Sequence, residues 1–310
     1  MDFSWCRGYV DQDPLGIDSQ LLRDQVRKDI LYMRSKTIAK KILDTEHSAS
    51  QVVPTGVLAD DPLPEAPPEL INGILLRYGA TGIIGAKETG KSLIALEIQH
   101  SLLTGEPLWG VIKPSEKLEK TCHFLAEHAS PVLMGLYQRT ELSKTGRLKI
   151  FGPEHLASMK LLVSNGARRE EAISFYKKCA EGSGLVVFDP LASFIQGESA
   201  ENDNAPMRSL VDSMIEIAQS TGAACLILGH QGKPMYFQGR QVKKTSYATR
   251  GASAAEDAMT AVHYLERESG VSVNGCQVFE LRPTHFKGFK SKPFKLLRDA
   301  RTCRHTLSKM

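Results

Sequence analysis

The segment Gly85–Ser92 reads GAKETGKS and follows the pattern G-x-x-x-x-G-K-[ST]. A short apolar run, TGIIG, leads into it, and a helix-like run, KSLIALEIQHSLL, begins at its lysine. Backbone N–H groups of such a loop can surround phosphate oxygens, which the positive end of the next helix also attracts. More than any other feature, this pattern constrains the fold: it predicts a strand, a phosphate-binding loop and a helix, and with them a nucleotide site.

Strand-like and helix-like runs alternate from Leu70 onward. The runs Gly184–Phe188 and Ala224–Leu228 are short and almost wholly apolar, as parallel strands covered on both faces require. Two later runs, MTAVHYLER and CQVFELRP, are expected to join the sheet as antiparallel additions. The sequence therefore predicts the α/β class, with a wound, mostly parallel sheet.

Composition changes along the chain divide it into four regions. Residues 19–46 have the apolar spacing of an amphipathic helix, and five prolines follow within VVPTGVLADDPLPEAPPEL. A helix on such a semi-rigid connector could reach a neighbouring subunit or another protein partner. The predicted regions are an N-terminal helical extension (1–47), a proline-rich linker (48–69), the α/β core (70–298) and a basic C-terminal tail (299–310).

Several classes of protein are excluded by composition. No apolar run approaches the roughly 20 residues of a membrane span, and the first residues lack a secretory signal. The 6 cysteines form no C-x-x-C pair, which argues against a zinc ribbon or a disulfide framework. We expect a cytoplasmic protein with no membrane contact. Its net charge of +4 is too small to prove a polyanionic partner.

The expected ligands are ATP and Mg²⁺. Lys91 would neutralise the β- and γ-phosphates, and the Ser92 hydroxyl would complete the coordination of the metal. Asp189, which ends the run LVVFD, would supply a metal-positioning carboxylate; the alternative is a helix cap, since Pro190 follows. The predicted nucleotide-binding residues are Gly85, Ala86, Lys87, Glu88, Thr89, Gly90, Lys91, Ser92 and Leu93.

Two further residues lie where strands are expected to end. Glu127 follows TCHFLA and could orient or deprotonate water, although a surface glutamate is an equal alternative. His230 ends ACLILGH and could donate to a γ-phosphate, although a lone histidine at a strand end is more often structural.

The chain resembles the RecA-like hexameric ATPases and, within them, the RepA-type replicative helicases of small plasmids and related phage or mobile-element ATPases. The resemblance covers about Leu70 to Arg298. Its motifs occur in the family's order: FLAEHASPVLMGLYQRT, VVFDPLASF, NDNAPMRSLVDSMIEIAQSTGAACLILGHQGK and TRGASAAEDAMTAVHYLE. It implies a RecA-like P-loop NTPase core that works as a homo-oligomer, with a hexameric ring as the expected form.

The resemblance also implies roles for individual residues. Glu127 matches the catalytic base, and His230 matches the histidine that senses the γ-phosphate. Arg139 falls where the family has an arginine near the phosphates, and Arg250 resembles the arginine finger that reaches the ATP of the neighbouring subunit. The chain departs from the family at Gly229, where plasmid helicases often carry a second histidine, and in its proline-rich N-terminal extension.

The segment between His230 and Glu256 is basic, with aromatic residues among the cations and no acidic residue. Charge for phosphates and rings for bases is the mixture that binds single-stranded nucleic acid; a solvated loop is the alternative. The predicted nucleic-acid contacts are Lys233, Arg240, Lys243 and Lys244.

These features favour an ATP-hydrolysing motor that translocates on single-stranded DNA as a replicative-type helicase. Two alternatives remain open. One is a RecA-like, DNA-stimulated ATPase in recombination, transposition or defence that does not unwind DNA. The other is an ATP-gated assembly module in which hydrolysis is slow.

Overall fold

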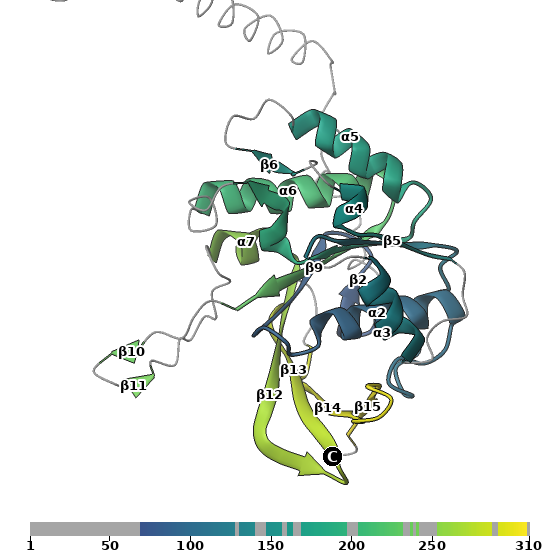
Figure 1. Cartoon of the computed structure of the whole chain (residues 1–310), viewed down its shortest axis with the longest axis vertical. Coiled ribbons are helices and arrows are strands. Elements are labelled where there is room, and N and C mark those ends of the chain that lie inside the picture. The colour runs from purple at the N-terminus through teal and green to yellow at the C-terminus, as the bar shows by residue number, and fades with distance from the viewer. Residues whose placement is uncertain are drawn as a thin grey trace, which may run out of the picture. The chain divides into compact units, whose positions relative to one another are not determined.

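A nine-stranded sheet in the order β15-β14-β13-β12-β3-β9-β7-β4-β5 runs through the computed structural model (Figure 1). The structure describes residues 69–127, 130–139, 147–156, 160–163, 169–196, 204–231, 236–237, 240–241, 253–286 and 291–308. The expected N-terminal helix lies outside them, as does the proline-rich linker up to residue 68. The described residues belong to one unit, Pro64–Met310.

Short apolar runs form the parallel part of this sheet. Its parallel strands are β5 (Leu148–Phe151), β4 (Thr121–Leu125), β7 (Leu185–Asp189), β9 (Ala224–His230), β3 (Ala80–Gly85) and β12 (Ala261–Val273). The antiparallel strands are β13 (Cys276–Phe286), β14 (Phe294–Arg298) and β15 (His305–Leu307). The expected wound, mostly parallel α/β sheet is confirmed.

Two details of the C-terminal region differ from expectation. The run MTAVHYLER was expected to be an antiparallel addition, but β12 pairs with β3 in parallel and only its partner β13 reverses direction. The parallel direction follows because α7 (Ser253–Ala258) lies between β9 and β12 in the chain and lets it cross over. The sheet also continues past the expected end at residue 298, because β15 pairs with β14 inside the region expected to be a tail.

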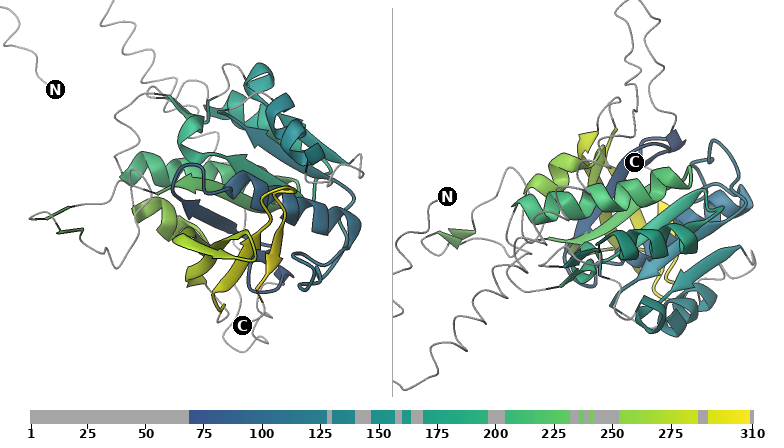
Figure 2. Two further views of the ribbon diagram at one scale, coloured as in Figure 1. Left: turned by 60° about the horizontal axis from the view of Figure 1, so that its bottom comes forward. Right: turned by 90° about the horizontal axis from the view of Figure 1, so that it is seen from above.

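Helices cover both faces of the sheet (Figure 2). Side chains alternate along each strand, so Val186 and Phe188 face α5 and α6 while Leu185 and Val187 face α2. The helices are α2 (Lys91–Thr104), α3 (Ser130–Arg139), α4 (Pro153–Leu156), α5 (Arg169–Ala180), α6 (Asn204–Ser220) and α7, together with the 3₁₀ helix η2 (Leu191–Phe194). No helix among the described residues is long and apolar enough to cross a membrane.

Smaller strand pairs lie outside the main sheet. They are β1 (Glu69–Ile71) with β2 (Leu75–Leu76), β6 (Leu162–Val163) with β8 (Ile195–Gln196), and β10 (Tyr236–Phe237) with β11 (Arg240–Gln241). The β12–β13 hairpin turns at Asn274 and Gly275, whose φ angles are 51° and 79°. Positive φ at both central residues is what a two-residue hairpin turn requires, and Asn-Gly adopts it readily.

A buried carboxylate fastens the last strand to helix α2. Glu97 accepts hydrogen bonds from Trp109 Nε1 at 2.9 Å and from the His305 backbone N–H at 2.8 Å. His305 Nδ1 lies 3.0 Å from the same carboxylate. Glu97 is 6% exposed and His305 4% exposed, so these partners replace water almost completely. The helix that begins at Lys91 is therefore held at its middle by β15.

We expect Glu97→Ala to lower the free energy of unfolding by about 3 to 5 kcal/mol, because it leaves buried donors of Trp109 and His305 without their acceptor. The midpoint of urea denaturation measures this loss. Glu106→Ala, at an exposed position of the following loop, is the control and should change stability by no more than about 0.5 kcal/mol. Equal effects of the two variants would contradict the fastening role.

Candidate active site

Parallel strand ends bring four segments of the sequence to one edge of the sheet. Gly85 at the end of β3 is in register with His230 at the end of β9, and Leu125 of β4 is in register with Asp189 of β7. Glu127 follows β4 by two residues. The carboxyl edge of the sheet therefore gathers the phosphate loop, the two candidate carboxylates and the candidate histidine, as ligand sites of open α/β sheets require.

The phosphate loop is fixed by close packing and by unusual backbone angles. A Cβ at Gly85 would lie 2.6 Å from the carbonyl oxygen of Leu265, so only glycine fits there. Gly90 has a φ of 92° and Glu88 a φ of 65°. The Thr89 hydroxyl donates to the carbonyl oxygen of Ala86 at 2.9 Å. Ala86, Lys87 and Glu88 are exposed, whereas Leu93 packs into the core.

Lys91 carries its charge into a nearly closed environment. It is 6% exposed, and Nζ donates to the carbonyl oxygens of Gly85 at 3.1 Å and Ala86 at 2.8 Å. Burial lowers the pKa of Lys91 to about 8, and the charges of Asp189 and Glu127 oppose that shift. The ammonium is therefore held at the loop by a few polar partners and would gain strongly from an anionic ligand.

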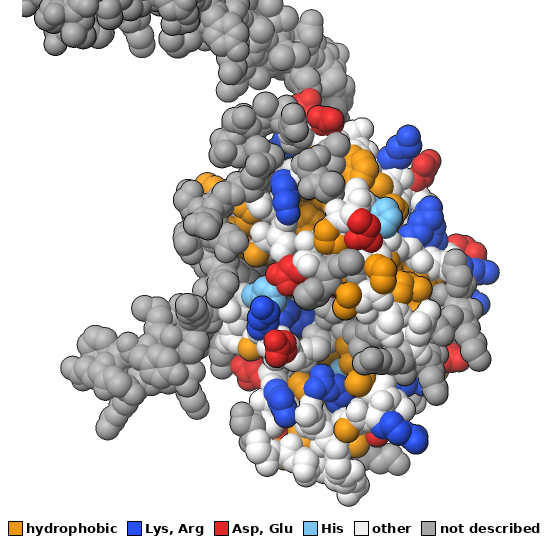
Figure 3. All heavy atoms as spheres, viewed as in Figure 1, with side chains coloured by type: hydrophobic (Ala, Val, Ile, Leu, Met, Phe, Trp, Pro, Cys, Tyr) orange, Lys and Arg blue, Asp and Glu red, His pale blue; other side chains and the backbone are white. Residues whose placement is uncertain are grey.

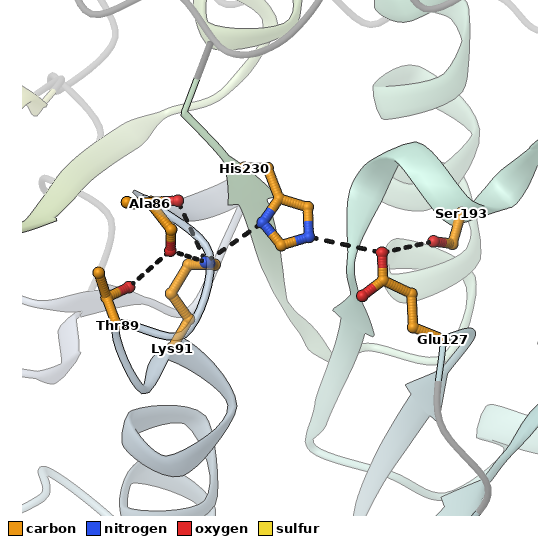
Figure 4. Close-up of polar contacts among 7 residues, drawn as sticks. Ala86, Thr89, Lys91, Glu127, Ser193 and His230 are labelled. Carbon is orange, nitrogen blue, oxygen red and sulfur yellow. Dashed lines mark hydrogen bonds and ion pairs between the residues drawn. The ribbon is translucent and has the colours of Figure 1, made fainter. Parts of the chain in front are cut away.

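His230 connects Lys91 to Glu127 (Figure 4). Its Nδ1 lies 3.4 Å from Lys91 Nζ, and its Nε2 lies 3.4 Å from Glu127 Oε1. Burial and the Lys91 charge lower the pKa of His230, against the raising effect of Glu127. A neutral imidazole that accepts from Lys91 at Nδ1 carries its proton on Nε2 and donates it to Glu127.

Glu127 has one oxygen engaged and one left for a ligand. Oε1 also accepts from the Ser193 hydroxyl at 3.3 Å, a contact drawn in Figure 4. Within the described residues, Oε2 has no hydrogen-bond partner. The carboxyl side chain is 35% exposed, so water can reach it. This arrangement can bind a water molecule and accept its proton.

The donor atoms at the edge fit Mg²⁺. Asp189 is 4% exposed, its Oδ2 lies 3.4 Å from His123 Nε2, and its Oδ1 makes no hydrogen bond in the described part of the chain. Ser92 lies in the first turn of α2, and its hydroxyl likewise has no hydrogen-bond partner among these residues. Mg²⁺ prefers hard oxygen ligands and completes its shell with phosphates and water, so one carboxylate and one hydroxyl suffice.

Several predicted site residues lie outside the described part of the chain. Arg139 ends helix α3, but nothing is described of its side chain. Arg240 begins β11 and is described only in its backbone. Lys233, Lys243, Lys244 and Arg250 are not described at all. Basic and acidic side chains are intermixed on the face in Figure 3, so the predicted nucleic-acid contact continues to rest on these residues.

Three buried or half-buried partners were missed by the sequence analysis: Gln99, His123 and Ser193. His123 lies within the wholly buried strand β4, and Gln99 lies on the buried face of α2. The available signal was a polar residue inside each apolar run, TCHFL and LIALEIQHSLL. Ser193 lies in η2, directly after β7.

The chain is similar to known proteins in sequence and in fold. The AAA domain family matches residues 46–235, which is more than half of the chain. Among solved structures, one described as the ATPase domain of a larger protein aligns with a TM-score of 0.51 and 11% sequence identity, over 75% of this chain and 86% of that one. At this identity the likeness concerns the fold, a RecA-like P-loop core. No curated protein gave a significant match.

The affinity for ATP should fall as the pH rises through 8, because the pKa of Lys91 is lowered to about 8 and its ammonium is lost above that pH. Between pH 7 and pH 9 the protonated fraction decreases about tenfold, so the Kd should increase by about that factor. His230, with its lowered pKa, is neutral throughout this range. Isothermal titration at each pH measures the Kd. Adenosine, which lacks phosphates, is the control, and a constant Kd for ATP would contradict the role of Lys91.

Proposed function

The chain belongs to the AAA domain family, and on this premise we propose that it is an ATP-hydrolysing homo-oligomer that translocates on single-stranded DNA, as RepA-type replicative helicases do. The proposed assembly is a hexameric ring with the ATP between neighbouring subunits. The P-loop core, the polar carboxyl edge of the sheet and the basic segment after β9 support this function together.

The observation that carries the proposal is the contact series Lys91–His230–Glu127. It links the lysine that would bind the γ-phosphate to the carboxylate that would activate water. Its middle member is the last residue of β9, immediately before the basic segment. Gln231 N–H donates to the Gly85 carbonyl oxygen at 3.0 Å, so the start of that segment is tied to the phosphate loop as well.

In the proposed reaction, each residue acts on a defined atom. Lys91 Nζ exchanges its contacts with the loop carbonyls for γ-phosphate oxygens. Glu127 Oε2 binds the attacking water and accepts its proton, while Ser193 and His230 hold Oε1 in place. Mg²⁺, held by Ser92 and Asp189, would neutralise charge that develops on the phosphate oxygens.

Loss of the γ-phosphate would change the hydrogen bonding of His230. When Lys91 releases the phosphate, it can return to the Gly85 and Ala86 carbonyls and to His230 Nδ1. The position of His230 then differs between the two nucleotide states, and the basic segment that begins at Gln231 would follow it. Lys233, Arg240, Lys243 and Lys244 would thereby change their contact with the strand of DNA, and Arg139 would add charge near the phosphates.

The arginine finger makes assembly necessary for turnover. Arg250 of one subunit would reach the ATP of the next and stabilise charge on the transferring phosphoryl group, which can contribute about 10³ to 10⁵ in rate. A closed ring of head-to-tail interfaces would give every subunit such a neighbour. If assembly proceeds normally but DNA leaves the rate unchanged, the ATP-gated assembly module is favoured instead. DNA-stimulated turnover without strand separation favours the non-unwinding ATPase.

Mixing two inactive variants tests the shared site. Lys91→Ala removes phosphate binding, and Arg250→Ala removes the finger, so each protein alone should hydrolyse almost no ATP in the presence of single-stranded DNA. In a random equal mixture about a quarter of the interfaces combine an intact loop with an intact finger, and turnover should recover to about that fraction of wild type.

The control for this experiment is a mixture of Lys91→Ala with Lys91→Ala/Arg250→Ala, which contains no intact interface and should stay inactive. Arg301→Ala, at an exposed position of the β14–β15 turn, should behave as wild type. Full turnover by Arg250→Ala alone, or no recovery in a mixture that assembles normally, would refute the shared site.

The basic segment can be tested through salt. Each lysine that contacts a phosphate of single-stranded DNA releases counterions, so removal of two lysines should reduce the slope of log K against log salt by about 1.4. Lys243→Ala/Lys244→Ala should show this change in fluorescence-anisotropy titrations with a labelled oligonucleotide. Lys113→Ala/Lys117→Ala, which removes two exposed lysines of the α2–β4 loop, should keep the wild-type slope. Identical slopes for all three proteins would exclude these contacts.

A further inference from the structure

Four buried polar side chains form a continuous series directly beneath the carboxyl edge of the sheet. Gln99 Nε2 lies 3.1 Å from Thr121 Oγ1, and Gln99 Oε1 lies 3.0 Å from His123 Nδ1. His123 Nε2 lies 3.4 Å from Asp189 Oδ2. Thr121, Gln99 and His123 are 0% exposed, and Asp189 is 4% exposed. Helix α2 and strands β4 and β7 thus meet through hydrogen bonds in an otherwise apolar layer.

A polar series of this kind stabilises the fold poorly for its position. Burial of an imidazole and an amide is unfavourable unless each polar atom finds a partner, and apolar side chains of similar volume would fill the same space without that requirement. Here the partners follow one another and end at a single acid, the candidate metal ligand. The outcome of the series is one hydrogen bond on one oxygen of Asp189.

The proton positions are consistent with that outcome. An ionised Asp189 accepts only, so His123 Nε2 must carry a proton in order to bind Oδ2. Nδ1 is then either bare or protonated, and the Gln99 amide can serve both cases because it can turn over and present nitrogen or oxygen. The Thr121 hydroxyl completes either arrangement, since it donates and accepts equally well. Gln99 therefore orients the His123 ring without interrupting the contact with Asp189.

We propose that His123, oriented by Gln99, is a positioning residue that binds Oδ2 of Asp189 and so directs Oδ1 toward the Mg²⁺ of the ATP complex. The inference rests on the proposed function, because it concerns how this chain holds the metal that accompanies ATP. Hydrogen bonds to ligating carboxylates fix their orientation, and loss of such partners typically reduces metal affinity 10- to 100-fold.

The test measures Mg²⁺ dependence and nucleotide binding separately. A fluorescent ATP analogue is titrated into the full-length protein in EDTA and then at increasing Mg²⁺. We expect His123→Leu to bind the analogue in EDTA as wild type does, within about twofold, and to require about 10- to 100-fold more Mg²⁺ for the half-maximal increase in affinity. His123→Gln, whose amide nitrogen can reach the position of Nε2, should return the Mg²⁺ midpoint to within about threefold of wild type.

His263→Leu is the matched control. His263 is also 0% exposed and lies in the parallel part of the sheet, but its Nε2 contacts the Ile74 carbonyl oxygen at 2.9 Å. This variant should lower thermal stability and leave the Mg²⁺ midpoint unchanged. A wild-type midpoint for His123→Leu, or an equal defect in His123→Gln and His123→Leu, would overturn the positioning role.

A second variant covers the case in which His123→Leu does not fold. Gln99→Leu keeps the imidazole but removes its orienting partner, and it should raise the Mg²⁺ midpoint in the same direction by at least about threefold. An unchanged midpoint would overturn the inference. If wild type and Lys91→Ala bind the analogue equally at all Mg²⁺ concentrations, the proposed function itself fails. A Mg²⁺-dependent wild type with an unaffected His123→Leu overturns only the role of His123.

Discussion

The ammonium of Lys91 is the charge on which the rest of the site depends. It lies at the start of a helix, 6% exposed, where burial disfavours a cation and lowers its pKa to about 8. The positive end of α2 adds to this cost, because the helix dipole favours an anion there. The surrounding groups offset the cost: two loop carbonyls, the neutral His230, and the carboxylates of Asp189 and Glu127. Such a site is complete only with a phosphate in it.

Parallel pairing makes those groups neighbours although they are distant in sequence. Lys91 and His230 are separated by 139 positions, and His123 and Asp189 by 66. Because adjacent parallel strands keep their carboxyl ends on one edge, each strand contributes its last residues to the same place. The two layers of the site then divide the work. Groups above the edge face the ligand, and the buried series beneath it orients Asp189.

The sequence predicted those parts of the fold that depend on local pattern. The loop GAKETGKS with its strand and helix follows from residue spacing, and the run LVVFD formed a buried strand that ends at Asp189. The direction of β12 was predicted wrongly, since direction depends on how the chain crosses from β9 and not on the composition of the strand.

The network of Gln99 and His123 could not be predicted, because a polar residue in an apolar run acquires a partner only when the register of β4 with β7 is known. Glu97 escaped notice for the same reason, since its partners come from β15 and from the loop after α2. The roles of Arg139, Arg250 and the basic segment remain predictions, because they depend on side chains beyond the described residues.

The β12–β13 hairpin offers a place where the chain can be lengthened. Residues 270–275 are all exposed around the Asn274–Gly275 turn, at the end of the hairpin away from the β3 pairing. Exposed loop tips of small and polar residues tolerate insertions best. A fluorescent reporter or a recruitment module could be grafted at this turn with the nucleotide-binding edge left intact, and natural lineages could diversify the protein by the same route.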